Sequence, residues 1–135
     1  MTGKGETVRD IMARHPASIR IGTDLTEVVE VLLRQHMTGL PVVDEADRVV
    51  GFVSEQDCLR TLLVSSYHGE GSPRVEDVMF REPLTVKLDD AVVDIAEQMV
   101  KQKPKIYPVV DQDGRLQGLL MRGQVLAHLI ESRRQ

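Results

Sequence analysis

Residues 38–57 read TGLPVVDEADRVVGFVSEQD, and 67 positions later residues 105–124 read KIYPVVDQDGRLQGLLMRGQ. The same offset aligns residues 8–63 with residues 75–130 without a gap, and 15 of the 56 aligned pairs are identical, which indicates one structural unit used twice. We expect the two copies to pack about a pseudo-two-fold axis. The repeat also provides an internal control, because a polar residue kept in only one copy is not expected to be needed for folding.

The size and composition of the chain predict one soluble module. A copy of 56 residues buries little of its surface and is marginal alone, so both copies are expected to share a core within the 135 residues. The net charge is −4 and there is no basic tract, so we expect no nucleic-acid binding. No apolar run approaches the ~20 residues of a membrane span and no signal peptide is recognisable, so we expect a cytoplasmic protein without a membrane partner. Cys58 is the only cysteine, which excludes an intramolecular disulfide.

Each copy predicts the same order of secondary structure, β-α-β-β-α, after a short amphipathic turn. In the first copy, apolar residues at helical spacing predict a helix, and two valine-rich strands follow around a tight turn at residues 44–47. The predicted fold class is therefore α+β, with two β-α-β-β-α repeats. Their expected boundaries are residues 7–65 for the first repeat, 66–74 for a linker rich in glycine, serine and proline, and 75–131 for the second repeat. The apolar stripe of the first helix consists of Leu25, Val28, Val29 and Leu32.

Two local features predict how these elements begin. Thr23 or Asp24 can cap the first long helix, and Asp89 or Asp90 can cap its counterpart. The proline before each Val-Val pair lacks an N–H group, so Pro41 is expected at the start of a strand or on a sheet edge.

Ser54 and Asp57 are the strongest candidates for a binding site. A strand ends at Val53 and a helix begins near Glu55, so this pair can form a capping box that serves only the helix. The same geometry also suits a ligand. The N-terminus of a helix favours a phosphate, and a carboxylate one turn into the helix can accept hydrogen bonds from both hydroxyls of a ribose.

The second copy distinguishes these two interpretations. Met121 and Gln124 replace Ser54 and Asp57, so the second helix is expected to begin without this cap. The pair is then not required by the fold, which favours a ligand in the first copy.

The segment that enters the first long strand is a weaker candidate. Thr38 and Gly39 could expose backbone groups to a flat heterocycle, but a helix C-cap with Gly39 at positive φ is the better interpretation of this segment taken alone. Lys103 and Lys105 occupy the matching place in the second copy. They could neutralise a phosphate, although solvated surface is the commoner role of exposed lysines.

No pattern in the sequence predicts catalysis or metal binding. The four histidines have no metal-ligand spacing, and no nucleophile with a matching base is recognisable, so we expect neither an enzyme nor a required cofactor. Cys58 is best interpreted as a small buried side chain.

These motifs resemble the cystathionine-β-synthase (CBS) domain family in its stand-alone tandem form, the Bateman module, over residues 7–131. The resemblance rests on Val-Arg-Asp-Ile-Met at residues 8–12, Val-Glu-Asp-Val-Met at 75–79, and the motifs at 38–44 and 51–57. The family resemblance implies two clefts that bind AMP, ADP, ATP or S-adenosylmethionine, a regulatory role and a homodimer. It also implies an effector protein that acts in trans, because no effector domain is fused to the module.

The resemblance assigns roles to particular residues. Asp57 would hold the ribose, with Ser54 near the ribose and phosphate and Thr38 and Gly39 against the base and sugar. The remaining positions complete the predicted site: Ala17, Ser18 and Phe52 would wall the adenine, and Lys105 would reach the phosphates. Because Met121 and Gln124 depart from the pattern, the second cleft is expected to bind weakly or not at all.

The sequence therefore predicts a regulatory module that senses an adenosine compound in the cleft of its first repeat. The alternative is a nucleotide-independent scaffold for dimerisation and protein interaction, because half of the nucleotide motifs are missing.

Overall fold

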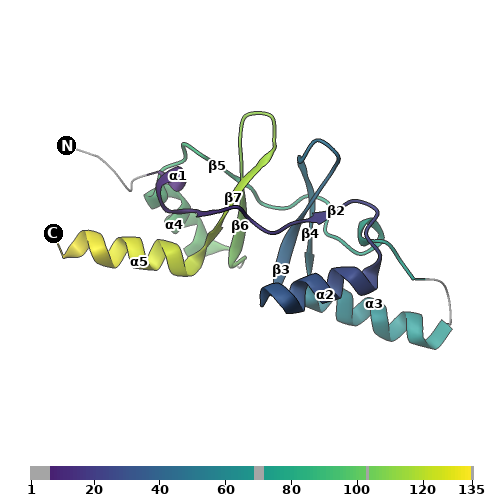
Figure 1. The fold of residues 1–135 in the computed structure, drawn as a ribbon. Coiled ribbons are helices and arrows are strands. Elements are labelled where there is room, and N and C mark those ends of the chain that lie inside the picture. Colours follow the sequence, from purple (N-terminus) through teal and green to yellow (C-terminus); the bar gives the residue numbers. More distant parts are fainter. Residues whose placement is uncertain (1–6, 69–71, 103, 135) are drawn as a thin grey trace. The chain divides into compact units, whose positions relative to one another are not determined.

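The computed structural model describes residues 7–68, 72–102 and 104–134 (Figure 1). These residues form two compact units that differ from the two repeats. The contiguous unit is Ala17–Pro83, and the composite unit combines Met1–Pro16 with Leu84–Gln135. Part of the expected linker, residues 69–71, and Lys103 lie outside the described residues.

The contiguous unit contains a three-stranded sheet and two long helices. Its strands have the order β2-β3-β4, with β2 parallel and β4 antiparallel to the central β3. Its elements are β2 (Ile19–Arg20), α2 (Leu25–Gln35), β3 (Gly39–Val43), β4 (Val49–Ser54), α3 (Glu55–His68) and the 3-10 helix η1 (Val75–Asp77).

The composite unit repeats this arrangement with one more strand. Its sheet has the order β1-β7-β6-β5, in which β5 is parallel to β6 and the other pairs are antiparallel. Its elements are α1 (Val8–Ile11), β1 (Ala13–Arg14), β5 (Val86–Lys87), α4 (Val92–Lys101), β6 (Ile106–Val110), β7 (Leu116–Met121) and α5 (Arg122–Arg133). The predicted α+β class and the β-α-β-β-α order of both repeats are confirmed.

Each unit contains parts of both repeats, because the first segment of each repeat docks on the other repeat's sheet. We call these segments the straps, residues 7–16 in the composite unit and residues 72–83 in the contiguous unit. In the contiguous unit, Phe80 exchanges two backbone hydrogen bonds with Phe52, at 2.8 and 2.9 Å. In the composite unit, Ala13 pairs with Leu119 in the same way along β1 and β7.

The identical Met12/Met79 and Gly51/Gly118 pairs of the repeat have a structural cause in these straps. A side chain at Gly51 would collide with the sulfur of Met79, and one at Gly118 would lie 2.6 Å from the sulfur of Met12. Each strap therefore fits its sheet only because glycine lies beneath the methionine.

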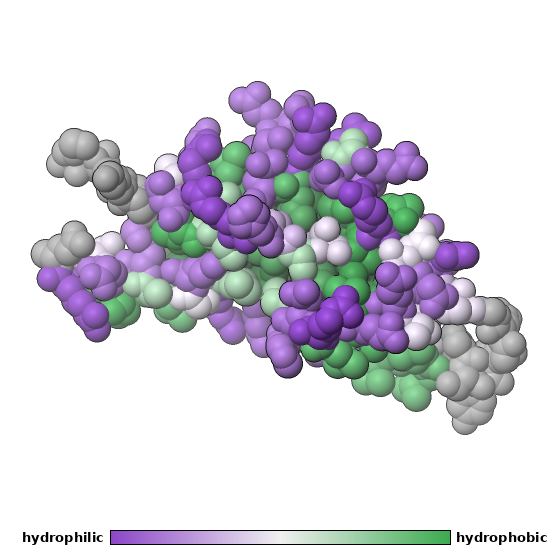
Figure 2. Space-filling model, viewed as in Figure 1, coloured by the Kyte–Doolittle hydropathy of each residue, from purple (hydrophilic) through white to green (hydrophobic). Residues whose placement is uncertain are grey.

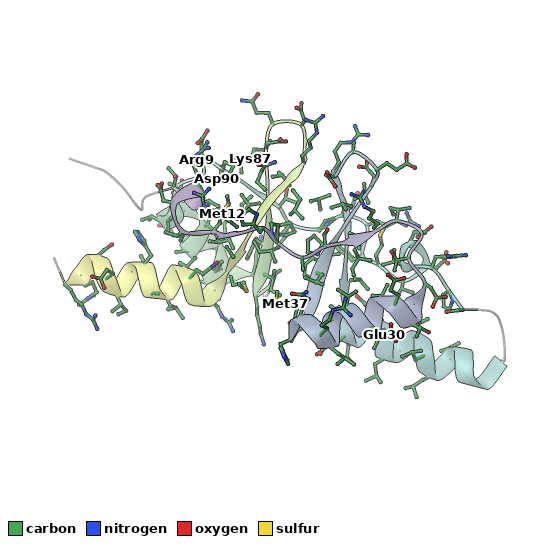
Figure 3. All side chains as sticks on the ribbon, viewed as in Figure 1. Arg9, Met12, Glu30, Met37, Lys87 and Asp90 are labelled. Atoms are coloured by element: carbon green, nitrogen blue, oxygen red, sulfur yellow. The ribbon has the colours of Figure 1, made fainter. Side chains whose placement is uncertain are left out.

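The strap of the composite unit also closes over the β5–α4 turn (Figure 3). The N–H of Arg9 donates to the carbonyl of Leu88 at 2.9 Å, and its guanidinium pairs with Asp89 at 2.8 Å. The N–H of Lys87 donates to the carboxylate of Asp90, also at 2.9 Å. The predicted cap for the second long helix is therefore wrong, because α4 begins after Ala91 without a side-chain cap while Asp90 closes the preceding turn. The corresponding cap in the first repeat is confirmed, since Asp24 accepts from the N–H of Thr26 at 2.9 Å.

The predicted apolar stripe forms the core of the contiguous unit. Leu25, Val28 and Leu32 of α2 are buried, and they share this burial with Leu40 and Val53 of the sheet. In the composite unit the corresponding core consists of Val8, Val86, Val92, Ile95, Tyr107, Val109, Leu120 and Val125.

The expected position of Pro41 is wrong, because it lies in the middle of the central strand β3. Pro41 faces Phe52 across the ladder, but the N–H and C=O of Phe52 bond to Phe80 on the other side. At this register β3 needs no N–H toward β4, so proline costs no hydrogen bond in that ladder.

Candidate functional site

Ser54 and Asp57 form a complete capping box at the start of α3. The N–H of Asp57 donates to the Ser54 hydroxyl at 3.1 Å, and the N–H of Ser54 donates to Asp57 Oδ2 at 3.2 Å. The Ser54 hydroxyl also donates to Oδ2 at 2.8 Å. The second oxygen, Oδ1, has an exposed partner, the guanidinium of Arg60 at 3.3 Å. The Asp57 side chain is held in place by its hydrogen bonds at the helix start. Because it is 26% exposed, a ligand can still reach it.

The expectation that the second repeat lacks this cap is confirmed for the N-cap side chain of Met121, but it is wrong for the acceptor three residues later. Gln124 accepts from the N–H of Met121 at 2.8 Å, so half of the capping box survives without a hydroxyl or a charge. Gln124 can replace the carboxylate here because one amide oxygen satisfies the same N–H group. The helix start therefore needs an acceptor at this position, but it does not need the negative charge of Asp57.

Thr38 and Gly39 lie beside this box at the start of β3. Gly39 faces Ser54 across the β3–β4 ladder, and the carbonyl of Thr38 accepts from the N–H of Glu55 at 2.9 Å. The proposed C-cap with positive φ at Gly39 is wrong. His36 takes the left-handed conformation at the end of α2, with φ of 55°, and Gly39 is a buried strand residue.

Phe52 explains why glycine is needed at position 39. A side chain there would lie 2.5 Å from the Phe52 ring, so the half-buried ring rests directly on the backbone of β3. In the composite unit the matching residues are Ile106 and Leu119. The second repeat thus exchanges the pairing of glycine with an aromatic ring for two aliphatic side chains.

The structure brings five of the predicted site residues together, namely Thr38, Gly39, Phe52, Ser54 and Asp57. Ala17 and Ser18 belong to the same unit, but they precede β2, on the far side of β3 from β4. Lys105 lies in the composite unit, exposed, where its carbonyl accepts from the N–H of Arg122 at 3.1 Å. The participation of Lys105 in the site stays a prediction.

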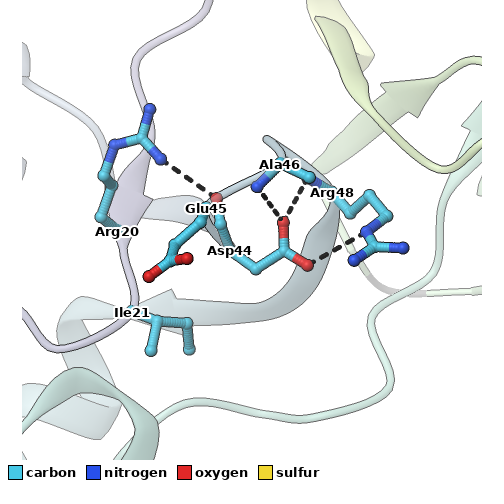
Figure 4. A pocket seen from close by; sticks show the side chains of 6 residues that line it. All are labelled: Arg20, Ile21, Asp44, Glu45, Ala46 and Arg48. Carbon is cyan, nitrogen blue, oxygen red and sulfur yellow. Dashed lines mark hydrogen bonds and ion pairs between the residues drawn. The ribbon is translucent and has the colours of Figure 1, made fainter.

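Sequence reasoning missed a cavity at the other end of the sheet (Figure 4). It has a volume of about 440 Å³ and is lined by Arg20, Ile21, Asp44, Glu45, Ala46 and Arg48. The guanidinium of Arg20 donates to the carbonyl of Asp44, and Arg48 pairs with the Asp44 carboxylate, each at 3.1 Å. Hydrogen bonds from the N–H of Arg48 and other neighbours hold the pKa of Asp44 below its usual value. These charges already satisfy one another.

A second feature that the sequence did not predict is an apolar groove between α2 and α3. Its volume is about 210 Å³, and its lining includes Leu33, Glu55, Cys58, Leu59 and Leu62. Figure 2 shows the apolar surface around these helices. Burial, followed by the charges of Asp57 and Glu55, raises the pKa of Cys58, which fits the predicted role of a buried thiol and not of a nucleophile.

Among the described residues, no group of three or more histidine, cysteine or acidic side chains could hold a metal ion. Within the same residues, no helix has the length and apolar character needed to cross a membrane.

Comparison with known proteins identifies the family. Residues 8–64 and residues 75–131 each match the CBS domain model, so the chain belongs to the CBS-domain family. The arrangement of two domains makes it a tandem CBS pair, as the resemblance implied.

Solved structures of CBS pairs match almost the whole chain. The structure of CBSX2 from Arabidopsis thaliana in complex with AMP is 32% identical, with a TM-score of 0.82, and the match covers 96% of this chain and 100% of that chain. The CBS pair of protein MJ0100 in complex with 5-methylthioadenosine and S-adenosylmethionine is 25% identical, with a TM-score of 0.75 and coverage of 92% and 98%.

Curated relatives differ in length. The uncharacterized protein MJ1426 of Methanocaldococcus jannaschii is 28% identical, and the match covers 96% of this chain and 95% of that protein. A homoserine O-acetyltransferase of Methanococcoides burtonii is 30% identical over 84% of this chain, but the match spans only 22% of the enzyme.

Proposed function

We propose that this CBS pair senses an adenosine compound, AMP or a related nucleotide or S-adenosylmethionine, at the Ser54–Asp57 box of the contiguous unit. The observation that carries the proposal is the difference between Asp57 and Gln124. Both satisfy the N–H group at the start of their helix, yet only the first repeat places a partly exposed carboxylate there. A charge that the fold does not require is best explained by a ligand.

The proposed chemistry follows from the atoms that remain available. Asp57 Oδ1 would accept hydrogen bonds from the ribose hydroxyls once the exposed Arg60 moves aside. In the first turn of the 14-residue helix α3, the N–H groups of Glu55 and Asp57 already donate to Thr38 and Ser54, so the phosphate or the equivalent polar group would face the N–H of Gln56, beside Ser54. Thr38, Gly39 and Phe52 would contact the base and sugar, with Ala17 and Ser18 at the far edge. The AMP-bound structure of CBSX2, which this chain matches over 96% of its length, supports this ligand class.

Calorimetry with AMP, ATP and S-adenosylmethionine tests the proposal. Asp57→Ala should lower the affinity for the preferred ligand by at least about tenfold, because a hydrogen bond to a charged group contributes ~1.5–3 kcal/mol. Gln124→Ala is the matched control, since it removes the corresponding cap from the composite unit and should leave affinity unchanged. Equal losses in the two variants, or no loss in Asp57→Ala, would contradict the site.

We further propose that the pair forms a homodimer through its long helices. Exposed apolar side chains recur at matching positions of both repeats: Leu33 and Val100 (62% and 87% exposed), Leu59 and Leu126 (55% and 58%), and Leu63 and Ile130 (62% and 50%). Apolar residues kept on the surface of both copies indicate a protein interface. The same faces favour the alternative function, a scaffold that dimerises without nucleotide.

Light scattering tests the dimer, and thermal stability with AMP distinguishes the two functions. The double variant Leu59→Glu/Leu126→Glu should be monomeric at concentrations at which the wild type is dimeric, because each glutamate would be buried without a partner. An increase in thermal stability with AMP supports sensing, whereas a dimer that no adenosine compound stabilises supports the scaffold.

We also propose that the module is regulatory and not itself an enzyme, and that it acts in the cytoplasm on an effector protein in trans, with no nucleic-acid or membrane partner. Membership of the CBS-domain family supports the regulatory role. Turnover of ATP by the purified chain, or its recovery with membranes or nucleic acid from cells, would contradict it.

A further inference from the structure

We infer that Phe80, which the second repeat contributes to the contiguous unit, stacks on the ligand's adenine base together with Phe52. This inference rests on the proposed adenosine site and assigns its base-binding surface.

The first observation is the register of the strap. Phe80 and Phe52 form a mutual antiparallel pair, with N–H to carbonyl distances of 2.8 and 2.9 Å. The side chains of directly paired residues stand on the same face of a sheet, about 5.5 Å apart at their Cα atoms. Both rings therefore lie on the face opposite the buried Val53. Because side chains alternate between the two faces of a strand, Ser54, two positions after Phe52, lies on the same face as both rings.

The second observation is the surface that the two rings present. Phe52 is fixed against the backbone at Gly39, which leaves one side of its ring for another group. Phe80 is 62% exposed, although it is one of the largest apolar side chains in the unit. An aromatic ring held by a paired backbone and left open to solvent suits a flat base, because every base offers a face for stacking.

The third observation is the internal control. In the composite unit the same strap position holds Ala13, and its partner in the ladder is Leu119. That unit keeps the strap, the methionine and the glycine, so neither ring is needed for docking the strap. The unit that lacks the aromatic pair is also the unit that lacks Ser54 and Asp57, so the two features occur together in the contiguous unit alone.

Stacking makes a specific prediction about ligands, because it acts on the base and not on the sugar. Phe80→Leu should lower the affinities for AMP and GMP by a similar factor, about tenfold. It should leave the affinity for ribose 5-phosphate, which is weaker in the wild type, unchanged. Phe80→Tyr should stay within about threefold of the wild type, because the ring is retained. Val64→Ala, which alters an exposed apolar side chain on α3, serves as the control and should have no effect.

Calorimetry of these variants is combined with NMR of ring-labelled phenylalanine. The chain contains only two phenylalanines, so contacts from adenine H2 and H8 to each ring can be assigned directly. We expect contacts to both rings in the wild type and to Phe52 alone in Phe80→Leu.

The possible outcomes separate the two proposals. If the wild type binds none of the adenosine compounds, the proposed function fails and the role of Phe80 fails with it. If the wild type binds AMP and Phe80→Leu binds it equally well, or shows no contact to the Phe80 ring, only the role of Phe80 is overturned. Equal losses in Phe80→Leu and Phe80→Tyr, or a matching loss for ribose 5-phosphate, would indicate a structural role and would also overturn it.

Discussion

The contiguous and composite units share one scaffold and differ where a ligand would bind. Both have a parallel two-residue strand beside the central strand, a strap methionine on a glycine, and an acceptor three residues after the N-cap of the closing helix. The contiguous unit adds a carboxylate, a hydroxyl and two aromatic rings. The corresponding residues of the composite unit are Gln124, Met121, Leu119 and Ala13.

This difference separates the requirements of folding from those of binding. Asp57 alone suggests a helix cap, and Gln124 shows that the cap tolerates a neutral amide. What remains specific to Asp57 is its charge. The comparison between the units therefore isolates one property of one side chain, its negative charge.

The strap glycines give the largest expected effect on stability. In Gly118→Ala the new methyl group would lie 2.6 Å from the backbone carbonyl of Ala13, whereas in Gly51→Ala its nearest neighbour is the flexible sulfur of Met79. We expect Gly118→Ala to lose about 3 kcal/mol of unfolding free energy and Gly51→Ala about 1 kcal/mol. Urea denaturation measures both values. Equal losses would contradict the different fit of the two straps.

Ligand stabilisation is the next largest effect and tests the difference between the units. A compound that binds only the folded state, present at 100 times its Kd, should raise the free energy of unfolding by about 2.7 kcal/mol. We expect AMP to raise the Tm of the wild type and of Gln124→Ala equally in differential scanning calorimetry, and that of Asp57→Ala by about half as much or less, because tenfold weaker binding leaves about 1.4 kcal/mol. A gain retained in Asp57→Ala and lost in Gln124→Ala would place the ligand in the composite unit.

Tyr107 offers a smaller effect within the composite core. Its hydroxyl is fully buried and has no hydrogen-bond partner in the part of the chain that the structure describes, and burial raises its pKa. The first repeat has Leu40 at the same position. Tyr107→Phe should therefore raise the unfolding free energy by about 1 kcal/mol, because it removes an unsatisfied polar group. A loss of stability in urea denaturation would show that the hydroxyl has a partner.

The smallest effect concerns the turn between β3 and β4. The folded pKa of Asp44 is lowered, so its ionised form stabilises the fold above the usual carboxyl pKa, and this contribution is lost as the pH falls through the lowered value. The Tm difference between wild type and Asp44→Asn should shrink below about pH 4. Asp111→Asn is the comparison, because Arg115 pairs with Asp113 at 3.9 Å and not with Asp111. Asp111→Asn should therefore lower the Tm at pH 7 by less than Asp44→Asn does. A Tm difference for Asp44→Asn that does not change with pH would contradict this role.

The repeat and its periodicity predicted the order of elements because hydrophobic spacing depends only on local geometry. They could not predict which sheet each strap joins. Met12 and Gly51 belong to one copy and Met79 and Gly118 to the other, so either pairing is compatible with the alignment, and only the folded chain shows that they cross. Pro41 was misplaced for a related reason. Its tolerance in the central strand depends on the register of β3 and β4, in which the backbone groups of Phe52 point away from Pro41 and bond to Phe80, 28 positions further along the chain.

The sequence could predict that part of the proposed site forms a local cluster, because Ser54 and Asp57 lie three residues apart at a helix start and Gly39 pairs with Ser54. Phe80, the proposed stacking residue, was not among the predicted residues because its relation to Phe52 arises from the crossed strap. Its one signal in the sequence is that an aromatic residue stands where the first repeat has Ala13.

An amide NMR titration with AMP tests the difference between the two units most directly. We predict that one equivalent of AMP per chain shifts the signals of Thr38, Gly39, Ser54 and Asp57, and leaves those of the matching residues Lys105, Ile106, Met121 and Gln124 nearly unchanged. Saturation at two equivalents, or larger shifts at Met121 and Gln124, would contradict a single nucleotide site built on the carboxylate of Asp57.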